Sequence, residues 1–219
     1  MGTGGISFLS QKHGWSADTI RNFEVVLPNG TIANVNRRSN PTLFSALRGG
    51  GNNFGIVTRF DMETFPQGKL WGGYQFYFPD PGEIKERRQK LGVPSPSPLT
   101  FDSLTHFSKL SASIVSGGFR AASYFGYNPS ITDFLKAFEA VVFKQDIDLH
   151  SHLFWSFSYV NQLDTYLFGG QLVHTEGKEW PEVFKEFKEL KKPVWSTSRQ
   201  ASMVELAKEV ENWSNVGPR

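Results

Sequence analysis

Apolar residues recur every three or four positions between residues 131 and 142, and this spacing predicts an amphipathic helix. Ser130 stands before the first helical residue, and Asp133 lies three positions later, which is a capping-box variant with Asp in place of Glu. The apolar positions expected on one face are Ile131, Phe134, Leu135, Phe138, Val141 and Val142. We expect this face to pack against a sheet.

Other segments of the same part of the chain alternate in the way that strands do. Leu70–Phe78 and Leu153–Val160 predict strands, and Gly170–Thr175 is the expected neighbour of the second. Further elements are expected as a helix before Leu110, a strand over 119–127, a helix from Pro181 and a helix over about 202–213. Irregular mixing of helices and strands favours an α+β fold, with an antiparallel sheet and helices on one face.

The first third of the chain predicts a β-hairpin. Phe23–Leu27 and Thr31–Val35 are rich in apolar residues and flank the sequence Pro28-Asn29-Gly30. Asn and Gly both tolerate the positive φ angles of tight hairpin turns. The two segments are therefore expected to pair.

A short helix, a glycine cluster and a strand follow between residues 40 and 60. Asn40 is expected to cap the helix and Pro41 to occupy its first turn, while Gly49–Gly51 end it. Gly55–Phe60 predicts a buried strand. The breaker sequence after Thr64 then places a domain boundary between residues 1–66 and 67–219.

The composition of this 219-residue chain excludes some classes of binding partner. Lys and Arg number 23 against 21 Asp and Glu without a dense basic block, which argues against nucleic acid or an anionic membrane as the partner. Aromatic residues make up 15% of the chain, and some are expected to line a pocket for a small organic molecule. No apolar run is long enough to span a membrane, no signal-peptide pattern opens the chain, and cysteine is absent.

Three segments resemble the FAD-binding domain of the berberine bridge enzyme-like oxidases, which belong to the vanillyl-alcohol oxidase superfamily with PCMH-type FAD-binding domains. They are GGISFLSQKHGWSADTI (Gly4–Ile20), NFEVVLPNGTIANVN (Asn22–Asn36) and NPTLFSALRGGGNNFGIVTRFDMETFP (Asn40–Pro66). The resemblance implies that residues 1–66 are the C-terminal part of such a domain. Residues 67–219 would form an incomplete substrate-binding domain.

The resemblance also implies an FAD cofactor and residues that contact it. The first glycine-rich loop would run beside the ribityl and phosphate groups at Gly4, Gly5 and Ser7. The adenosine side would be contacted by Asn53, Gly55, Ile56 and Val57. Strands of the second domain would cover the flavin and line the substrate pocket, with candidates Tyr74, Tyr77, Tyr124, Trp155, Tyr159 and Gln171.

Two other chemistries are weaker candidates. The run GGGNNFG lacks the Lys-Ser/Thr pair of a phosphate-binding loop and lies between a helix and a strand, so a nucleoside triphosphatase is not expected. His150 and His152 are two positions apart near a strand start and would be possible metal ligands. No further ligand completes a set nearby in the sequence, so we predict no metal.

The chain also departs from the family it resembles. Family members carry an earlier segment with the pyrophosphate loop and the residues that attach flavin covalently, and this sequence has no counterpart of that segment. We therefore expect a fragment of an FAD-linked oxidase that transfers hydride from a small organic substrate to flavin and then to oxygen. Any FAD would be bound non-covalently. A flavin-free cyclase or isomerase, and a non-catalytic small-molecule binding protein, remain as alternatives.

Overall fold

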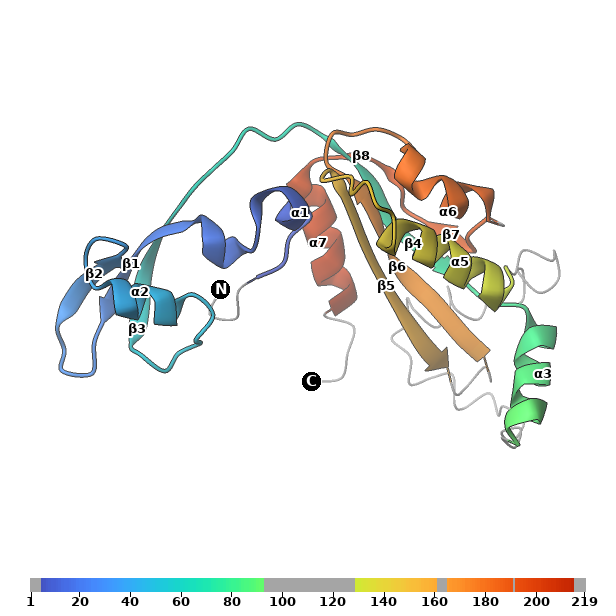
Figure 1. The fold of residues 1–219 in the computed structure, drawn as a ribbon, viewed down its shortest axis with the longest axis horizontal. Coiled ribbons are helices and arrows are strands. Elements are labelled where there is room, and N and C mark those ends of the chain that lie inside the picture. The colour runs from blue at the N-terminus through green and yellow to red at the C-terminus, as the bar shows by residue number, and fades with distance from the viewer. Residues whose placement is uncertain (1–4, 93–128, 161–164, 191, 215–219) are drawn as a thin grey trace. The chain divides into compact units, whose positions relative to one another are not determined.

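The computed structural model describes residues 5–92, 129–160, 165–190 and 192–214 and divides the chain into two compact units (Figure 1). Unit 1 comprises Met1–Gln67 and unit 2 comprises Gly68–Arg219. The division falls one residue after the boundary that the sequence predicts. The expected helix before Leu110 and the expected strand over 119–127 lie outside the described residues.

Unit 1 is a three-stranded antiparallel sheet with short helices. The elements are α1 (Ser10–His13), the 3-10 helix η1 (Ser16–Thr19), β1 (Ile20–Val26), β2 (Ile32–Asn36), α2 (Pro41–Leu47) and β3 (Ile56–Met62). The strand order is β2-β1-β3. The predicted hairpin is confirmed, because Val26 pairs with Ile32 across the turn.

The core of unit 1 forms where one face of the sheet meets α2. Phe23, Val25 and Val35 from the strands pack with Phe44 and Leu47 of the helix, and all five are buried. Burial of these apolar side chains supplies the main favourable free energy for this small unit.

One local prediction for unit 1 is wrong and another is confirmed only in part, because Asn40 is the N-cap residue of α2 but does not cap it with its side chain. Asn40 adopts a left-handed backbone conformation with φ 58°, and its side chain makes no capping hydrogen bond to the described residues of the helix; its carbonyl accepts from the amide of Phe44 instead. The strand β3 is not buried, since Ile56 is 70% exposed and most of its other residues are exposed. Within the described residues β3 is an edge strand that pairs only with β1, so one long side of it is uncovered.

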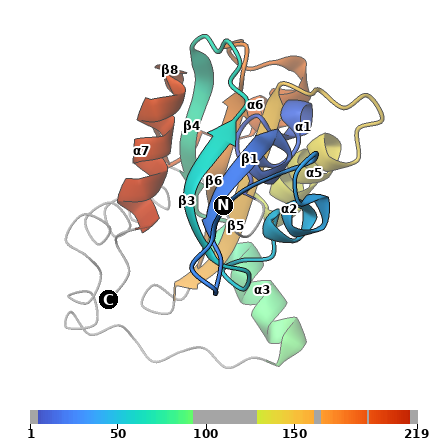
Figure 2. The same ribbon diagram turned by 90° about the vertical axis from the view of Figure 1, so that its left-hand side faces the viewer.

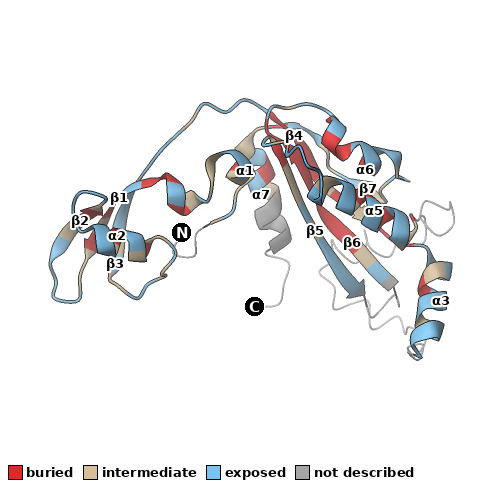
Figure 3. Cartoon of the chain, in the orientation of Figure 1, coloured by how far each residue is buried: buried red, intermediate tan, exposed pale blue. Residues whose placement is uncertain are grey.

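Unit 2 is built around a second antiparallel sheet. Its strands are β4 (Leu70–Tyr77), β5 (Ser151–Val160), β6 (Thr165–His174), β7 (Trp195–Ser196) and β8 (Arg199–Ala201). The order is β5-β6-β4-β7, and β8 also pairs with β4. Figure 3 shows that the central strands β4 and β6 are the buried ones, while much of β5 is exposed.

The helices of unit 2 are α3 (Pro81–Leu91), α5 (Ile131–Val142), the 3-10 helix η4 (Glu182–Phe184), α6 (Lys185–Glu189) and α7 (Met203–Ser214). Aromatic residues of α5, η4 and α6 pack on one face of the sheet, around Phe134, which is fully buried. Figure 2 shows α7 apart from α5 and α6, beside β4 and β8. The predicted mixture of helices with an antiparallel sheet is confirmed.

The helix α5 begins and ends as predicted, and Ser130 is confirmed as its N-cap, but the predicted capping box with Asp133 is not formed among the described contacts. The Ser130 hydroxyl accepts a hydrogen bond from the backbone amide of Thr132. Two residues expected on the buried face are instead exposed, with Leu135 at 39% and Val142 at 51%. The core meets α5 along the narrower stripe that includes Phe134 and Ala137.

Register assigns each strand residue of unit 2 to a face. Residues paired across an antiparallel ladder point to the same side of the sheet, and successive residues alternate. Tyr77 pairs with Phe168, which places both on the face covered by α5 and α6. Tyr74 pairs with Gln171, and this pair lies on the opposite face.

None of the described helices combines the length and the apolar character that crossing a lipid bilayer requires.

Candidate functional site

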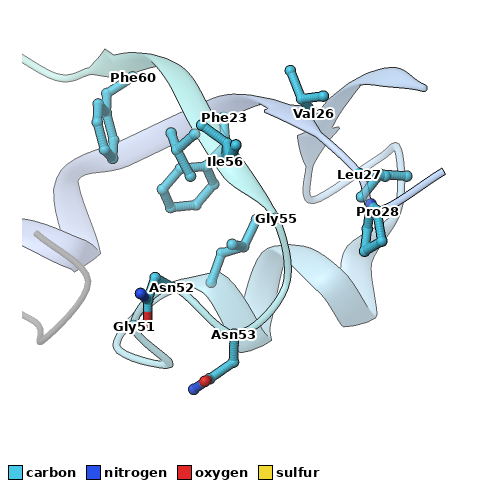
Figure 4. Close-up of a pocket in the computed structure, with 12 residues that line it drawn as sticks. Phe23, Val26, Leu27, Pro28, Gly51, Asn52, Asn53, Gly55, Ile56 and Phe60 are labelled. Atoms are coloured by element: carbon cyan, nitrogen blue, oxygen red, sulfur yellow. The ribbon is translucent and has the colours of Figure 1, made fainter. Parts of the chain in front are cut away.

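A pocket of about 900 Å³ opens in unit 1 beside the start of β3 (Figure 4). Its walls come from β1, the hairpin turn that follows it, the end of α2, the loop before β3 and β3 itself. The lining residues are Phe23, Val26, Leu27, Pro28, Leu47, Gly51, Asn52, Asn53, Gly55, Ile56, Val57 and Phe60. Segments about thirty residues apart in the chain therefore form one concave surface.

Gly55 shapes this pocket because the backbone of β3 passes very close to β1 at this residue. Its φ is +149°, and a Cβ atom there would lie 2.6 Å from the carbonyl oxygen of Val26 and 2.8 Å from a methyl group of Val25. Any side chain would force the two strands apart. The need for glycine at position 55 is thus explained by strand packing alone.

The glycine cluster that ends α2 has a similar role. A Cβ atom at Gly50 would lie 2.2 Å from the carbonyl oxygen of Ala46, so the chain turns tightly over the helix end. The Asn53 side chain holds the loop by donating from Nδ2 to the carbonyl of Gly50 at 2.8 Å. These contacts set the loop that forms one rim of the pocket.

The pocket combines apolar walls with a polar rim. Phe23 and Phe60 pack with ring centroids 5.7 Å apart, and Ile56 is largely exposed at the pocket. The amides of Asn52 and Asn53 lie at the other rim (Figure 4). A flat, largely apolar ring system with hydrogen-bonding edges suits this combination of surfaces.

Four predicted cofactor residues come together here, since Asn53, Gly55, Ile56 and Val57 all line the pocket. Sequence analysis did not predict that Val26–Pro28 would line the pocket. This segment precedes the Asn-Gly pair of the hairpin, and the pairing of β1 with β3 places it opposite the glycine loop. No sequence pattern marks that long-range pairing.

The predicted cofactor residues Gly5 and Ser7 lie in a separate turn. The carbonyl of Gly5 accepts from the amide of Ser16, and the hydroxyl of Ser7 accepts from the amide of Leu9. Neither Gly5 nor Ser7 lines the pocket. Gly4 lies outside the described residues.

In unit 2 the face of the sheet opposite α5 and α6 carries Tyr74 and Gln171. Gln171 is 3% exposed, and its Nε2 atom has no hydrogen-bond partner among the described residues. A buried amide group without a partner costs free energy. A bound molecule would accept a hydrogen bond from this atom only after the side chain moves out of its buried position.

Tyr74 is a neutral hydrogen-bonding group at ordinary pH. Burial raises the pKa of its phenol, and the nearby carboxylate of Glu209 raises it further. Both effects oppose a phenolate. The side chain is therefore suited to donate or accept hydrogen bonds rather than to act as an anionic base.

The other described candidates of the substrate pocket lie on the opposite face. Trp155 stacks on Phe187 with centroids 5.5 Å apart and planes at 3°, within the core that α5 and α6 cover. Tyr159 lies on the same face and contacts Tyr166. Tyr77 is also buried there, whereas Tyr124 lies outside the described residues. The candidates therefore do not share one face.

One histidine of the predicted pair belongs to a polar cluster that the sequence did not reveal. His150 Nδ1 lies 3.0 Å from the Thr175 hydroxyl and Nε2 lies 3.3 Å from Glu176. His174 belongs to the same cluster, because its Nε2 atom lies 3.5 Å from an oxygen of the Asp148 carboxylate. His152 pairs with Val173 within the sheet, and burial lowers its pKa. The described residues contain no group of three or more side chains placed to hold a metal ion.

Comparisons with known proteins identify the class. No protein-family model matches the chain. It is 59% identical over 70 residues to the FAD-dependent monooxygenase tpcD of Cochliobolus heterostrophus, covering 32% of this chain and 14% of that protein. It is 42% identical over 104 residues to the FAD-dependent monooxygenase CTB5 of Cercospora beticola, covering 47% of this chain and 19% of that protein. The matches thus span only a minor part of these relatives.

Solved structures agree in fold. The 6-hydroxy-D-nicotine oxidase of Arthrobacter nicotinovorans superposes with a TM-score of 0.62 at 19% identity, covering 99% of this chain and 37% of that one. The berberine bridge enzyme-like protein 1 of Physcomitrella patens gives 0.57 at 15% identity, covering 99% and 38%.

The aligned parts of this chain, 32% and 47% of its length, are therefore homologous to a minor part of FAD-dependent monooxygenases. More particularly, it shares its fold with solved flavoproteins of the vanillyl-alcohol oxidase type and the berberine bridge enzyme-like type, as the three sequence segments predict.

Replacing Gln171 by Leu should raise the free energy of unfolding by about 1–2 kcal/mol, because it removes a buried donor that has no partner among the described residues. Gln75 is the matched control in the neighbouring strand. It is also buried, but it accepts from the Tyr77 hydroxyl and donates to Ser198. Gln75→Leu should lower the unfolding free energy by about 1–3 kcal/mol. Urea denaturation followed by tryptophan fluorescence measures both free energies of unfolding. An equal decrease in the two variants would show that the Gln171 amide does have a hydrogen-bond partner.

The free energy of unfolding should fall as the pH drops below about 6.5, the ordinary histidine pKa in the unfolded chain. Burial lowers the pKa of His174 below that value, against the opposing influence of Asp148, and its Nδ1 accepts from the backbone amide of Lys178. The unfolded chain therefore takes up a proton that the folded chain does not.

The slope from this one residue reaches at most about 1.4 kcal/mol per pH unit. Denaturation midpoints between pH 5 and 8 test it, with His174→Gln expected to flatten the dependence. An unchanged slope in that variant would contradict the assignment.

Proposed function

We propose that unit 1 holds the adenosine side of FAD in an FAD-linked oxidoreductase acting on a small organic molecule. The observation that carries this proposal is the meeting of Asn53, Gly55, Ile56 and Val57 in one pocket. These four residues are neighbours in the sequence, and what the fold adds is the facing wall that β1 and its turn supply at Val26–Pro28. The FAD-dependent relatives support the same cofactor.

The pocket suits an adenosine group in shape and chemistry. Its volume is in the range of ordinary small-molecule sites, and Phe23, Phe60 and Ile56 provide apolar surface for a flat base. The loop at Asn52 and Asn53 offers amide groups at the rim.

On the substrate side, Tyr74 and Gln171 are the groups that we assign to orientation. FAD, when bound, supplies the redox chemistry by accepting a hydride from a substrate carbon. Gln171 would donate a hydrogen bond from Nε2 to a substrate oxygen, which relieves its unpaired state. Tyr74 would remain a neutral phenol and fix the position of the substrate without removing a proton as an anion.

Replacing Ile56 by Glu should weaken FAD binding by tenfold or more. The change places a carboxylate in an apolar wall and beside an anionic cofactor. Ile56 is 70% exposed, so the variant should fold. Titration of FAD with the chain, followed by flavin fluorescence, gives the dissociation constant.

Ile32→Glu is the matched control. Ile32 is 68% exposed on the other edge strand of the same sheet, and it does not line the pocket. Its FAD affinity should stay within twofold of the parent chain. Gly55→Val is a poor test, because its side chain would push β3 away from β1.

The titration also separates the alternatives. Saturable FAD binding that Ile56→Glu alone weakens supports the proposal. If the folded chain takes up no FAD, the proposal fails for this chain, and a flavin-free catalyst or a binding protein becomes the better account.

A further inference from the structure

A second pocket, here called the α3–α5 pocket, lies within unit 2 on the face of the sheet that carries Tyr77 and Trp155. Its volume is about 440 Å³. Its residues come from α3, α5, β5 and β6, and none of them lines the pocket of unit 1. Tyr74 and Gln171 lie on the opposite face of the sheet, so this pocket is separate from the substrate side proposed above.

One wall is a single face of α3. Ile84, Arg87, Arg88 and Leu91 occupy positions i, i+3, i+4 and i+7, a spacing that places side chains on one face of a helix. The Asp80 side chain caps this helix, accepting from the amides of Gly82 and Glu83. Two guanidinium groups therefore stand between two aliphatic side chains on a well-defined helix.

The floor and the facing wall are apolar. Phe157 of β5 and Phe168 of β6 are paired in register with ring centroids 5.0 Å apart. The next pair on the same face of the sheet is Tyr159 with Tyr166, whose ring centroids are 5.2 Å apart. From α5 comes Leu135, which is 39% exposed instead of buried in the core. Phe157, Tyr159 and Tyr166 are each at least 40% exposed. An apolar ligand would cover this surface with a gain in free energy.

The charge in the pocket has one sign. Both charged residues among its described lining residues are arginines, and no carboxylate belongs to that set. Glu83 contacts Arg87 at 2.9 Å from outside the lining, and its other oxygen accepts from the backbone amide of Ile131, which ties α3 to the start of α5. Arginine presents a planar fork of donors that matches a carboxylate.

We propose that the α3–α5 pocket binds an elongated apolar acid, that is, a molecule with an aliphatic or aryl tail and one carboxylate. The tail would lie on the aromatic floor, and the carboxylate would meet the arginines of α3. This site would act independently of FAD, because all of its residues belong to unit 2 and to the helix-covered face.

Decanoate and decylammonium are suitable probes, because they share one tail and differ in the sign of the head group. Isothermal titration calorimetry of the whole chain, at concentrations well below micelle formation, measures both. Decanoate should bind at least tenfold more tightly than decylammonium. Equal affinities, or no binding of decanoate, would overturn the proposal.

Two pairs of variants locate the site. Leu135→Glu places a carboxylate in the pocket and should weaken decanoate binding tenfold or more, whereas Val142→Glu, on the same helix outside the pocket, should leave it within twofold. Arg88→Gln should weaken binding about tenfold by removing a charge-assisted hydrogen bond, while Lys85→Gln removes a charge from the same helix outside the pocket. Equal effects within either pair would contradict this site.

Discussion

The close approach of backbone between Gly55 and Val26 is the constraint on which unit 1 depends. It draws the start of β3 against the end of β1, and it thereby sets the glycine loop opposite the hairpin turn. The pocket is the space that remains between these two connections. Glycine at position 55 is thus structural first, and the ligand-binding surface arises from the neighbouring residues that it positions.

In unit 2 the register between paired strands determines which side chains lie on each face of the sheet. The pairing of β4 with β6 sends Tyr77 toward the helices and Tyr74 to the other side, so two tyrosines of one strand acquire different environments. One face becomes an aromatic core that ends in the α3–α5 pocket. The other carries the Gln171 amide, which has no partner among the described residues. A single sheet can therefore offer two chemically different surfaces.

Local patterns predicted much of the fold. The hairpin turn at Asn29-Gly30, the α5 cap at Ser130 and the strands β4, β5 and β6 are encoded by nearby residues, and these are confirmed. What failed depends on distant neighbours. The exposure of β3 follows from its edge position, and the exposure of Leu135 from which helix stripe meets the sheet. Sequence periodicity indicates an apolar face, but tertiary packing decides how much of it is covered.

The central claim is that the pocket beside β3 receives the adenosine part of FAD. Backbone amide NMR of the chain, with FAD added in steps, tests it most directly because it reports each residue without any substitution. The account predicts saturable shifts at Asn53, Gly55, Ile56 and Val57, with the amide of Asn36 at the other end of β2 unchanged. Shifts that spare these four residues while FAD binds elsewhere in the chain would contradict it.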